Sequence, residues 1–147
     1  MRIVDRLTLP GALGAALLAE ARRAPSIEVC GLIADGGAPS PAHYPIANRA
    51  SRAVDRFEMD PAGQIAAFKR MRRHGHTLIA IYHSHPGGEA EPSIHDRRGH
   101  TYPEAAAVIV APNARVGRLI RAWKLAGDMP CEIPIEWTDP PPPGGFL

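Results

Sequence analysis

The stretch Leu78-Ile79-Ala80-Ile81-Tyr82-His83-Ser84-His85-Pro86, followed after residues 87–92 by Ser93-Ile94-His95-Asp96, joins an apolar run to a group of polar side chains. Residues 78–81 are apolar at every position, which is typical of a central strand buried on both faces. Side chains alternate between the two faces of a strand, so His83 and His85 project to the same side and can hold one ion. The stretch therefore predicts a metal site at the carboxyl end of a central strand.

The donor atoms of this motif favour zinc. Two imidazole nitrogens and the Asp96 carboxylate suit zinc better than magnesium or calcium, which prefer oxygen ligands. Structural zinc sites are usually rich in thiolates, whereas three protein ligands leave the fourth tetrahedral position open to water. Part of the motif has a second interpretation, because Ser93-x-x-Asp96 is also a capping box that begins a short helix.

A hydrolytic zinc site also needs a base, and the chain offers Glu28 for that role. Glu28 precedes the apolar run of residues 29–33, where a partly buried carboxyl group would have its pKa raised toward neutrality. The alternative is an exposed charge at the end of a strand. Glu89 and Glu91 lie in the loop of the motif, and we expect them to be solvated.

Hydrophobic periodicity predicts a mixed α/β (α+β) fold in one domain, with a mainly antiparallel sheet flanked by helices. Helices are expected over residues 11–24 and 61–74 and from residue 93. Pro134 cannot donate to a strand ladder, which predicts an edge position for the last strand. The expected strands cover residues 2–9, 28–34, 42–47, 78–81, 105–111, 116–125 and 131–137.

Length and charge limit the function classes that the chain can belong to. The 147 residues fit one domain, which we place at 1–138, followed by a flexible Pro/Gly-rich tail at 139–147. A formal charge of +2, from 17 basic and 15 acidic residues, is too balanced to predict a nucleic-acid or membrane partner. No apolar run is long enough to span a bilayer and no signal peptide is apparent, so the expected location is the cytoplasm.

Glu28 ahead of a Gly-containing apolar strand, together with His83-x-His85-Pro86-x6-Ser93-x-x-Asp96, resembles the JAMM motif of the MPN metallopeptidase family, also called the JAB domain. Every motif position carries the family residue at the family spacing, and the resemblance extends over about residues 27–126. It implies the MPN fold, which is similar to that of cytidine deaminases, with zinc held by His83, His85 and Asp96. It also implies that Glu28 is the catalytic base and that Ser93 stabilises the developing oxyanion.

A short chain without long insertions is similar to the small bacterial branch of this family. That resemblance implies a zinc metallopeptidase of cysteine biosynthesis, which releases cysteine or another C-terminal residue from a ubiquitin-like sulfur-carrier protein ending in Gly-Gly. Three other hypotheses stay open: a cell-wall or phage-type peptide hydrolase, a RadC-like protein, and a non-catalytic MPN scaffold. Small domains of this kind often pair through apolar edges, which leaves a homodimer open as well.

Overall fold

The computed structural model describes residues 4–139, which form eight short strands and three helices. The N-terminal part carries one strand and one helix, and the last helix lies directly before the second half of the sheet. In chain order the elements are β1 Leu7–Pro10, α1 Gly11–Arg23, β2 Cys30–Asp35, β3 Ala42–Ile46, α2 Pro61–Arg73, β4 Thr77–Ser84, α3 Ile94–Gly99, β5 Ala106–Val110, β6 Ile120–Lys124, β7 Cys131–Ile133 and β8 Ile135–Thr138.

Six of these strands form one sheet in the order β3-β2-β4-β5-β6-β7, while β1 and β8 pair with each other in parallel. All neighbours in the six-stranded sheet are antiparallel except β4 and β5, which are parallel. The predicted fold class, a mixed fold built on a mainly antiparallel sheet, is therefore confirmed. β4 lies between β2 and β5, so hydrogen bonds on both sides fix the strand that carries the motif histidines.

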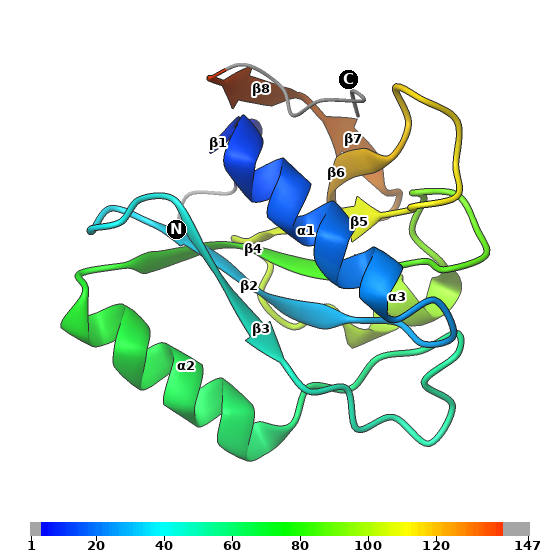
Figure 1. Ribbon diagram of the computed structural model, residues 1–147, viewed down its shortest axis with the longest axis horizontal. Coiled ribbons are helices and arrows are strands. Elements are labelled where there is room, and N and C mark those ends of the chain that lie inside the picture. The colour runs from blue at the N-terminus through cyan, green and yellow to red at the C-terminus, as the bar shows by residue number, and fades with distance from the viewer. Residues whose placement is uncertain (1–3, 140–147) are drawn as a thin grey trace.

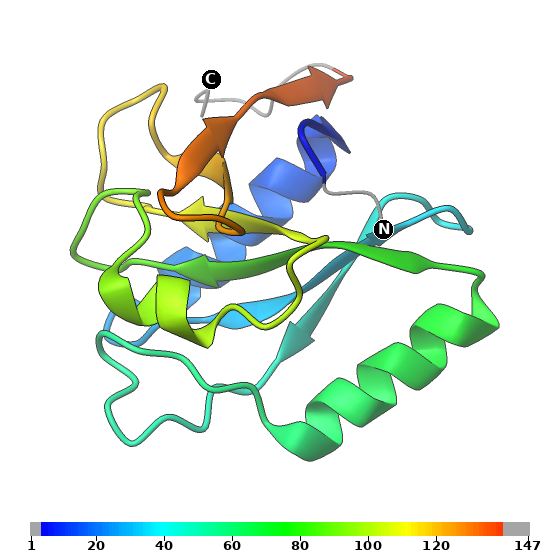
Figure 2. The same ribbon diagram turned by 180° about the vertical axis from the view of Figure 1, so that it is seen from behind.

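Helices cover both faces of the sheet (Figures 1 and 2). On one face, Leu17 of α1 packs with Tyr82 and Val108 in the larger hydrophobic cluster. On the other face, Met71 of α2 belongs to a cluster with Ile81 of β4. Figure 1 shows α1 in front of the sheet, whereas α3 stands in front in Figure 2, so α3 lies on the face opposite α1.

Local sequence explains where α2 begins and ends. The Asp60 carboxylate accepts a hydrogen bond from the Gly63 N–H at 3.0 Å, and Pro61 fills the first helical position, where no N–H is needed. Gly75 follows the helix with φ of 70°, a conformation that glycine adopts without steric cost. The cap at Asp60 therefore fixes where the long connection from β3, residues 47–60, ends and α2 begins.

Several strand predictions are wrong in extent. Of the strand expected over 2–9, residues 2–3 lie outside the described residues, and β1 begins only at Leu7, because Asp5 and Arg6 are exposed and have no apolar surface to cover. The strand expected over 131–137 divides into β7 and β8 at Pro134. Proline has no N–H to extend the ladder to β6, and its carbonyl accepts instead from the Leu7 N–H at 3.0 Å, so the chain turns toward β1. β7 does lie at the sheet edge, as predicted.

The strand expected over 116–125 is also shorter than predicted. β6 begins only at Ile120, after a turn in which Gly117 has φ of 87°. The predicted flexible tail lies outside the described residues apart from Asp139. Within residues 4–139, no helix has the length and apolar character that crossing a bilayer requires.

Candidate metal centre

The two motif histidines lie at the carboxyl end of β4, on one side of the strand. His83 is opposite Cys30 of β2 and Ile109 of β5, and only 2% of its surface is exposed. His85 comes just after the strand, but its backbone N–H still donates to the Val110 carbonyl at 2.8 Å. Hydrogen bonds to neighbouring strands thus hold the backbone of both histidines. Because side chains alternate between the two faces of a strand, the imidazoles of His83 and His85 lie on the same side.

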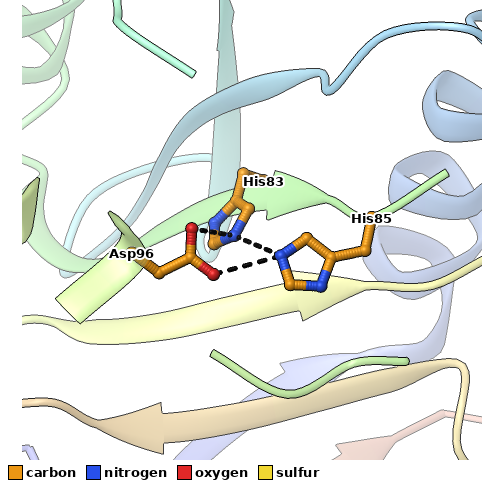
Figure 3. Close-up of side chains that lie close together, drawn as sticks. All are labelled: His83, His85 and Asp96. Atoms are coloured by element: carbon orange, nitrogen blue, oxygen red, sulfur yellow. Dashed lines mark hydrogen bonds and ion pairs between the residues drawn. The ribbon is translucent and has the colours of Figure 1, made fainter. Parts of the chain in front are cut away.

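Asp96 reaches the histidines from α3, and Ser93-x-x-Asp96 forms the capping box that begins this helix. The Ser93 hydroxyl accepts from the Asp96 N–H at 3.1 Å, and Asp96 Oδ2 accepts from the Ser93 N–H at 2.8 Å, which completes a capping box. The same carboxylate lies 3.1 Å from His83 Nε2 through Oδ1 and 3.1 Å from His85 Nε2 through Oδ2. Figure 3 shows the three side chains pointing toward one another.

The spacing of the donor atoms fits a zinc ion. His83 Nε2 and His85 Nε2 are 3.1 Å apart, so three donor atoms surround a common point. Zinc bonds of about 2.0–2.1 Å at the tetrahedral angle separate neighbouring ligand atoms by about 3.3 Å. Nitrogen and carboxylate ligands at this spacing could hold a divalent transition metal.

Neighbouring groups fix the orientation and charge of the imidazoles. His85 Nδ1–H donates to the Glu89 carbonyl at 2.7 Å, which leaves the Nε2 lone pair directed at the cluster. Burial lowers the pKa of His83, so its ring favours the neutral form that a metal requires. Phe57 stacks on the His83 ring with centroids 4.5 Å apart. Burial opposes ionisation of Asp96, but the neighbouring imidazoles and the Ser93 N–H outweigh burial and hold the pKa of this carboxyl below its usual range.

Glu28 lies beside the cluster and is buried, not an exposed charge at the end of a strand. Its residue surface is 3% exposed, and its Oε2 lies 3.9 Å from His85 Nε2. Among residues 4–139, Glu28 Oε1 has no hydrogen-bond partner. Burial, opposed in part by His85, raises the pKa of Glu28 to about 8. An acceptor oxygen without a partner is therefore available next to the candidate metal ligands.

Open space adjoins the centre on two sides. A cavity of about 430 Å³ touches His83 and Asp96 and is walled by Phe57, Met59 and Tyr102, among other side chains. A shallower groove of about 470 Å³ contains Glu28, His85 and Ser93 and includes Gly87 and Gly88 on its wall. The candidate metal ligands and Glu28 thus border both the cavity and the groove, and each of these could bind one part of a substrate.

The loop between His85 and Asp96 is anchored by residues that no sequence motif indicated. Trp123 Nε1–H of β6 donates to the Ala90 carbonyl at 2.8 Å, and Asn113 Nδ2 donates to the Pro86 carbonyl at 2.7 Å. Ala90 is fully buried, whereas Glu91 is exposed, as predicted, and pairs with Arg121 at 3.3 Å. The loop that connects two candidate ligands is therefore fixed on the sheet.

Asn48 anchors the backbone of Glu28, and the sequence did not indicate this contact either. The side-chain amide of Asn48 donates to the Glu28 carbonyl at 2.9 Å, although 20 residues separate them. In the same peptide unit, the Val29 N–H donates to the Ser84 hydroxyl at 2.9 Å. Asn48 follows a predicted strand in a polar connection, where an asparagine carries no distinguishing signal.

Comparisons with known proteins agree with this geometry. Residues 11–126 match the family model described as prokaryotic homologs of the JAB domain. The chain is 30% identical over 119 residues to desampylase of Haloferax volcanii, covering 76% of this chain and 85% of that protein. It is 29% identical over 123 residues to CysO-cysteine peptidase of Mycobacterium tuberculosis, covering 82% and 84% of the two chains.

A solved structure is similar over the same region. A protein from Desulfitobacterium hafniense, known from its solution structure, matches with a TM-score of 0.80 and 27% identity. The match covers 92% of this chain and 94% of that one. The family model spans α1 to just beyond β6 and includes all the residues of the candidate centre, so the chain belongs to the prokaryotic JAB family.

Proposed function

We propose that this chain is a zinc-dependent peptidase that hydrolyses the amide bond after the C-terminal Gly-Gly of a ubiquitin-like sulfur-carrier protein, releasing cysteine or another C-terminal residue. The observation that carries the proposal is the cluster of His83, His85 and Asp96 beside a buried oxygen of Glu28 that has no hydrogen-bond partner among the described residues. Similarity to CysO-cysteine peptidase supports this kind of substrate, and similarity to desampylase supports hydrolysis by the same family.

His83, His85 and Asp96 would hold the zinc. Zinc bound there would make a water molecule nucleophilic near neutral pH and polarise the scissile carbonyl. The protein supplies the orientation, because β4 is fixed between two strands and Asp96 is fixed by the cap of α3. The buried setting of His83 also excludes bulk water from one side of the cluster.

Glu28 would move the proton. Its carboxylate accepts a proton from the attacking water and then passes it to the amide nitrogen as the carbon–nitrogen bond breaks. The products are a carrier with a free C-terminal carboxylate and a free amine, and Glu28 returns to its ionised form. A pKa raised toward neutrality suits this exchange, because both protonation states are then accessible at working pH.

Ser93 would stabilise the negative charge that develops on the carbonyl oxygen. Its hydroxyl oxygen accepts from the Asp96 N–H, so its own proton remains available for donation. One well-placed donor of this kind is worth about 10²–10³-fold in rate. Ser93 lines the same groove as Glu28, so both groups would act from one side on a substrate bound there.

The groove supports an extended glycine-rich substrate. Gly87 and Gly88 lie on its wall, and no atom lies within 4 Å of the position that a Cβ on Gly87 would occupy. A peptide backbone can approach closely where side chains are absent, as in recognition by strand addition.

Mass spectrometry of two substrates tests the proposal. The zinc-loaded protein is incubated with a carrier ending in Gly-Gly-Cys and, separately, with a carrier joined through Gly-Gly to a lysine side chain. We expect the first to lose one cysteine residue, and the Glu28→Ala variant to leave it intact although it retains zinc. Cleavage of the lysine conjugate alone would replace the substrate assignment with isopeptide hydrolysis. Cleavage of neither substrate by zinc-loaded protein would contradict the proposed function.

A further inference from the structure

The side chain of Asn48 uses its whole hydrogen-bonding capacity on four backbone groups. Its Nδ2 donates to the carbonyls of Glu28 and Arg56, each at 2.9 Å. Its Oδ1 accepts from the N–H groups of Ala50 at 2.9 Å and Glu58 at 3.0 Å. Two carbonyls on one side and two N–H groups on the other allow only one orientation of the amide. Asn48 therefore joins the segment before β2 to the connection between β3 and α2.

The position of the Glu28 carboxylate depends on this backbone attachment. Glu28 Oε1 has no hydrogen-bond partner within residues 4–139, and Oε2 lies 3.9 Å from His85 Nε2, beyond hydrogen-bond distance. The side chain is thus not aligned by a strong contact of its own. Its backbone is held instead, because the Glu28 N–H donates to the Ala53 carbonyl at 2.7 Å and the Glu28 carbonyl accepts from Asn48.

The same amide also fixes one wall of the cavity beside His83. Between the two bonded residues Arg56 and Glu58 lies Phe57, whose ring stacks on His83 at 4.5 Å. All three residues line the cavity of about 430 Å³. One side chain therefore connects the candidate base on one side of the metal cluster with the cavity wall on the other.

We propose that Asn48 is a positioning residue that holds Glu28 and the 56–58 wall as one unit, so that the base is aligned with a substrate lying against that wall. The inference rests on the proposed function for the role of Glu28. Within the described residues, the four hydrogen bonds of the Asn48 side chain all go to backbone groups outside the three candidate ligands, so its loss should affect proton transfer and leave metal binding in place.

Asn48→Asp is the sharpest variant, because it keeps the side-chain shape and both acceptor bonds but loses the two donor bonds to Glu28 and Arg56. We expect kcat on the Gly-Gly-Cys carrier to fall about tenfold or more, since small misplacements of a catalytic group cost up to about a hundredfold. Zinc affinity should stay within about threefold of the wild-type value. Hydrogen exchange of the amides over residues 26–30 and 50–58 should accelerate, and Asn48→Ala should show the same changes more strongly.

Arg49→Ala is the matched control, because Arg49 lies in the same connection and its side chain forms an exposed ion pair with Asp60 at 3.1 Å, without a hydrogen bond to Glu28 or residues 56–58 in the part of the chain that the structure describes. It should leave kcat, zinc affinity and exchange at residues 26–30 unchanged. Wild-type kcat and exchange in Asn48→Asp would overturn the proposal. A parallel loss of zinc would also overturn it, because that result indicates a general structural role. If the zinc-loaded wild type hydrolyses no carrier, the proposed function fails, and exchange at residues 26–30 still decides whether Asn48 holds Glu28.

Discussion

Ser93 has two roles that substitution can separate at the scale of a single residue. Ser93→Ala removes the acceptor for the Asp96 N–H and also the proton that we assign to the oxyanion. We expect kcat to fall about 10²–10³-fold and the free energy of unfolding to fall by about 1 kcal/mol through loss of the helix cap. Steady-state kinetics and urea unfolding measure the two effects.

Ser93→Thr is the control for this prediction, because threonine keeps the hydroxyl and is an acceptable cap. It should retain most of the activity and stability. Wild-type kcat in Ser93→Ala would remove the oxyanion role, even if the variant were less stable.

The close approach of His83, His85 and Asp96 could be predicted from the sequence because its geometry is local. His83 and His85 share a side through strand alternation, and Asp96 is placed by the cap that Ser93 begins. Asn48 and Phe57 could not be predicted, because they reach Glu28 and His83 only after residues 47–60 fold back on the sheet. Local spacing holds no information about such contacts.

Close packing of β2 against β3 and β4 depends on a glycine, Gly31, in β2. A Cβ added to Gly31 would lie 2.4 Å from the Tyr44 carbonyl oxygen of β3 and 2.5 Å from Cε1 of Tyr82 in β4. Gly31→Ala should therefore destabilise the protein by about 1–3 kcal/mol, as overpacking in a core does. Gly99→Ala is the matched control, because no atom lies within 4 Å of that Cβ position. Equal unfolding midpoints for the two variants would show that the sheet accommodates the methyl group.

The contact between β6 and the motif loop is a second element-scale prediction. Trp123→Phe keeps an aromatic ring under the Arg121 guanidinium, now 4.9 Å from the ring centroid, but loses the N–H bond to Ala90. We expect zinc affinity to fall about tenfold, at the low end of the effect of residues that support metal ligands. A chelator competition assay measures the change.

Glu132→Gln is the control for that measurement, because it weakens a neighbouring ion pair with Arg121 without touching the loop carbonyl. It should bind zinc as the wild type does. If Trp123→Phe also binds zinc with wild-type affinity, the loop keeps its position without this bond.

The extent of the strands shows why element boundaries were harder to predict than element order. The alternation in residues 131–137 is real, but the strand divides at Pro134 because β6 and β1 offer different partners on its two sides. The start of β1 is likewise set by burial, because Leu7 is the first described residue whose side chain is buried. Partners far along the chain decide these limits.

For the whole molecule, Glu20 should make stability depend on pH. Burial raises the pKa of Glu20 above its ordinary value of 4.5, although the Tyr82 hydroxyl donates to it at 2.7 Å. The folded state therefore holds this proton more tightly than the unfolded state, so the stabilisation is present below pH 4.5 and is lost as pH rises through the folded pKa. Glu20→Gln keeps an acceptor oxygen and removes the titration.

Urea unfolding at pH 4 and pH 7.5, with a chelator present, tests this expectation. Relative to the wild type, Glu20→Gln should gain stability as the pH rises, since only the wild type must ionise a partly buried carboxyl group. A stability difference that stays constant across this range would contradict it.

The most direct measurement is single-turnover hydrolysis of a Gly-Gly-Cys carrier by zinc-loaded wild type and Glu28→Gln, with the zinc content of each sample determined at the same time. We expect equal zinc in the two proteins and a rate about 10²–10⁴-fold lower in Glu28→Gln, the range that loss of a general base produces. Equal rates would contradict the assignment of Glu28 to the proton, and loss of zinc from Glu28→Gln would contradict a metal site formed by His83, His85 and Asp96 without Glu28.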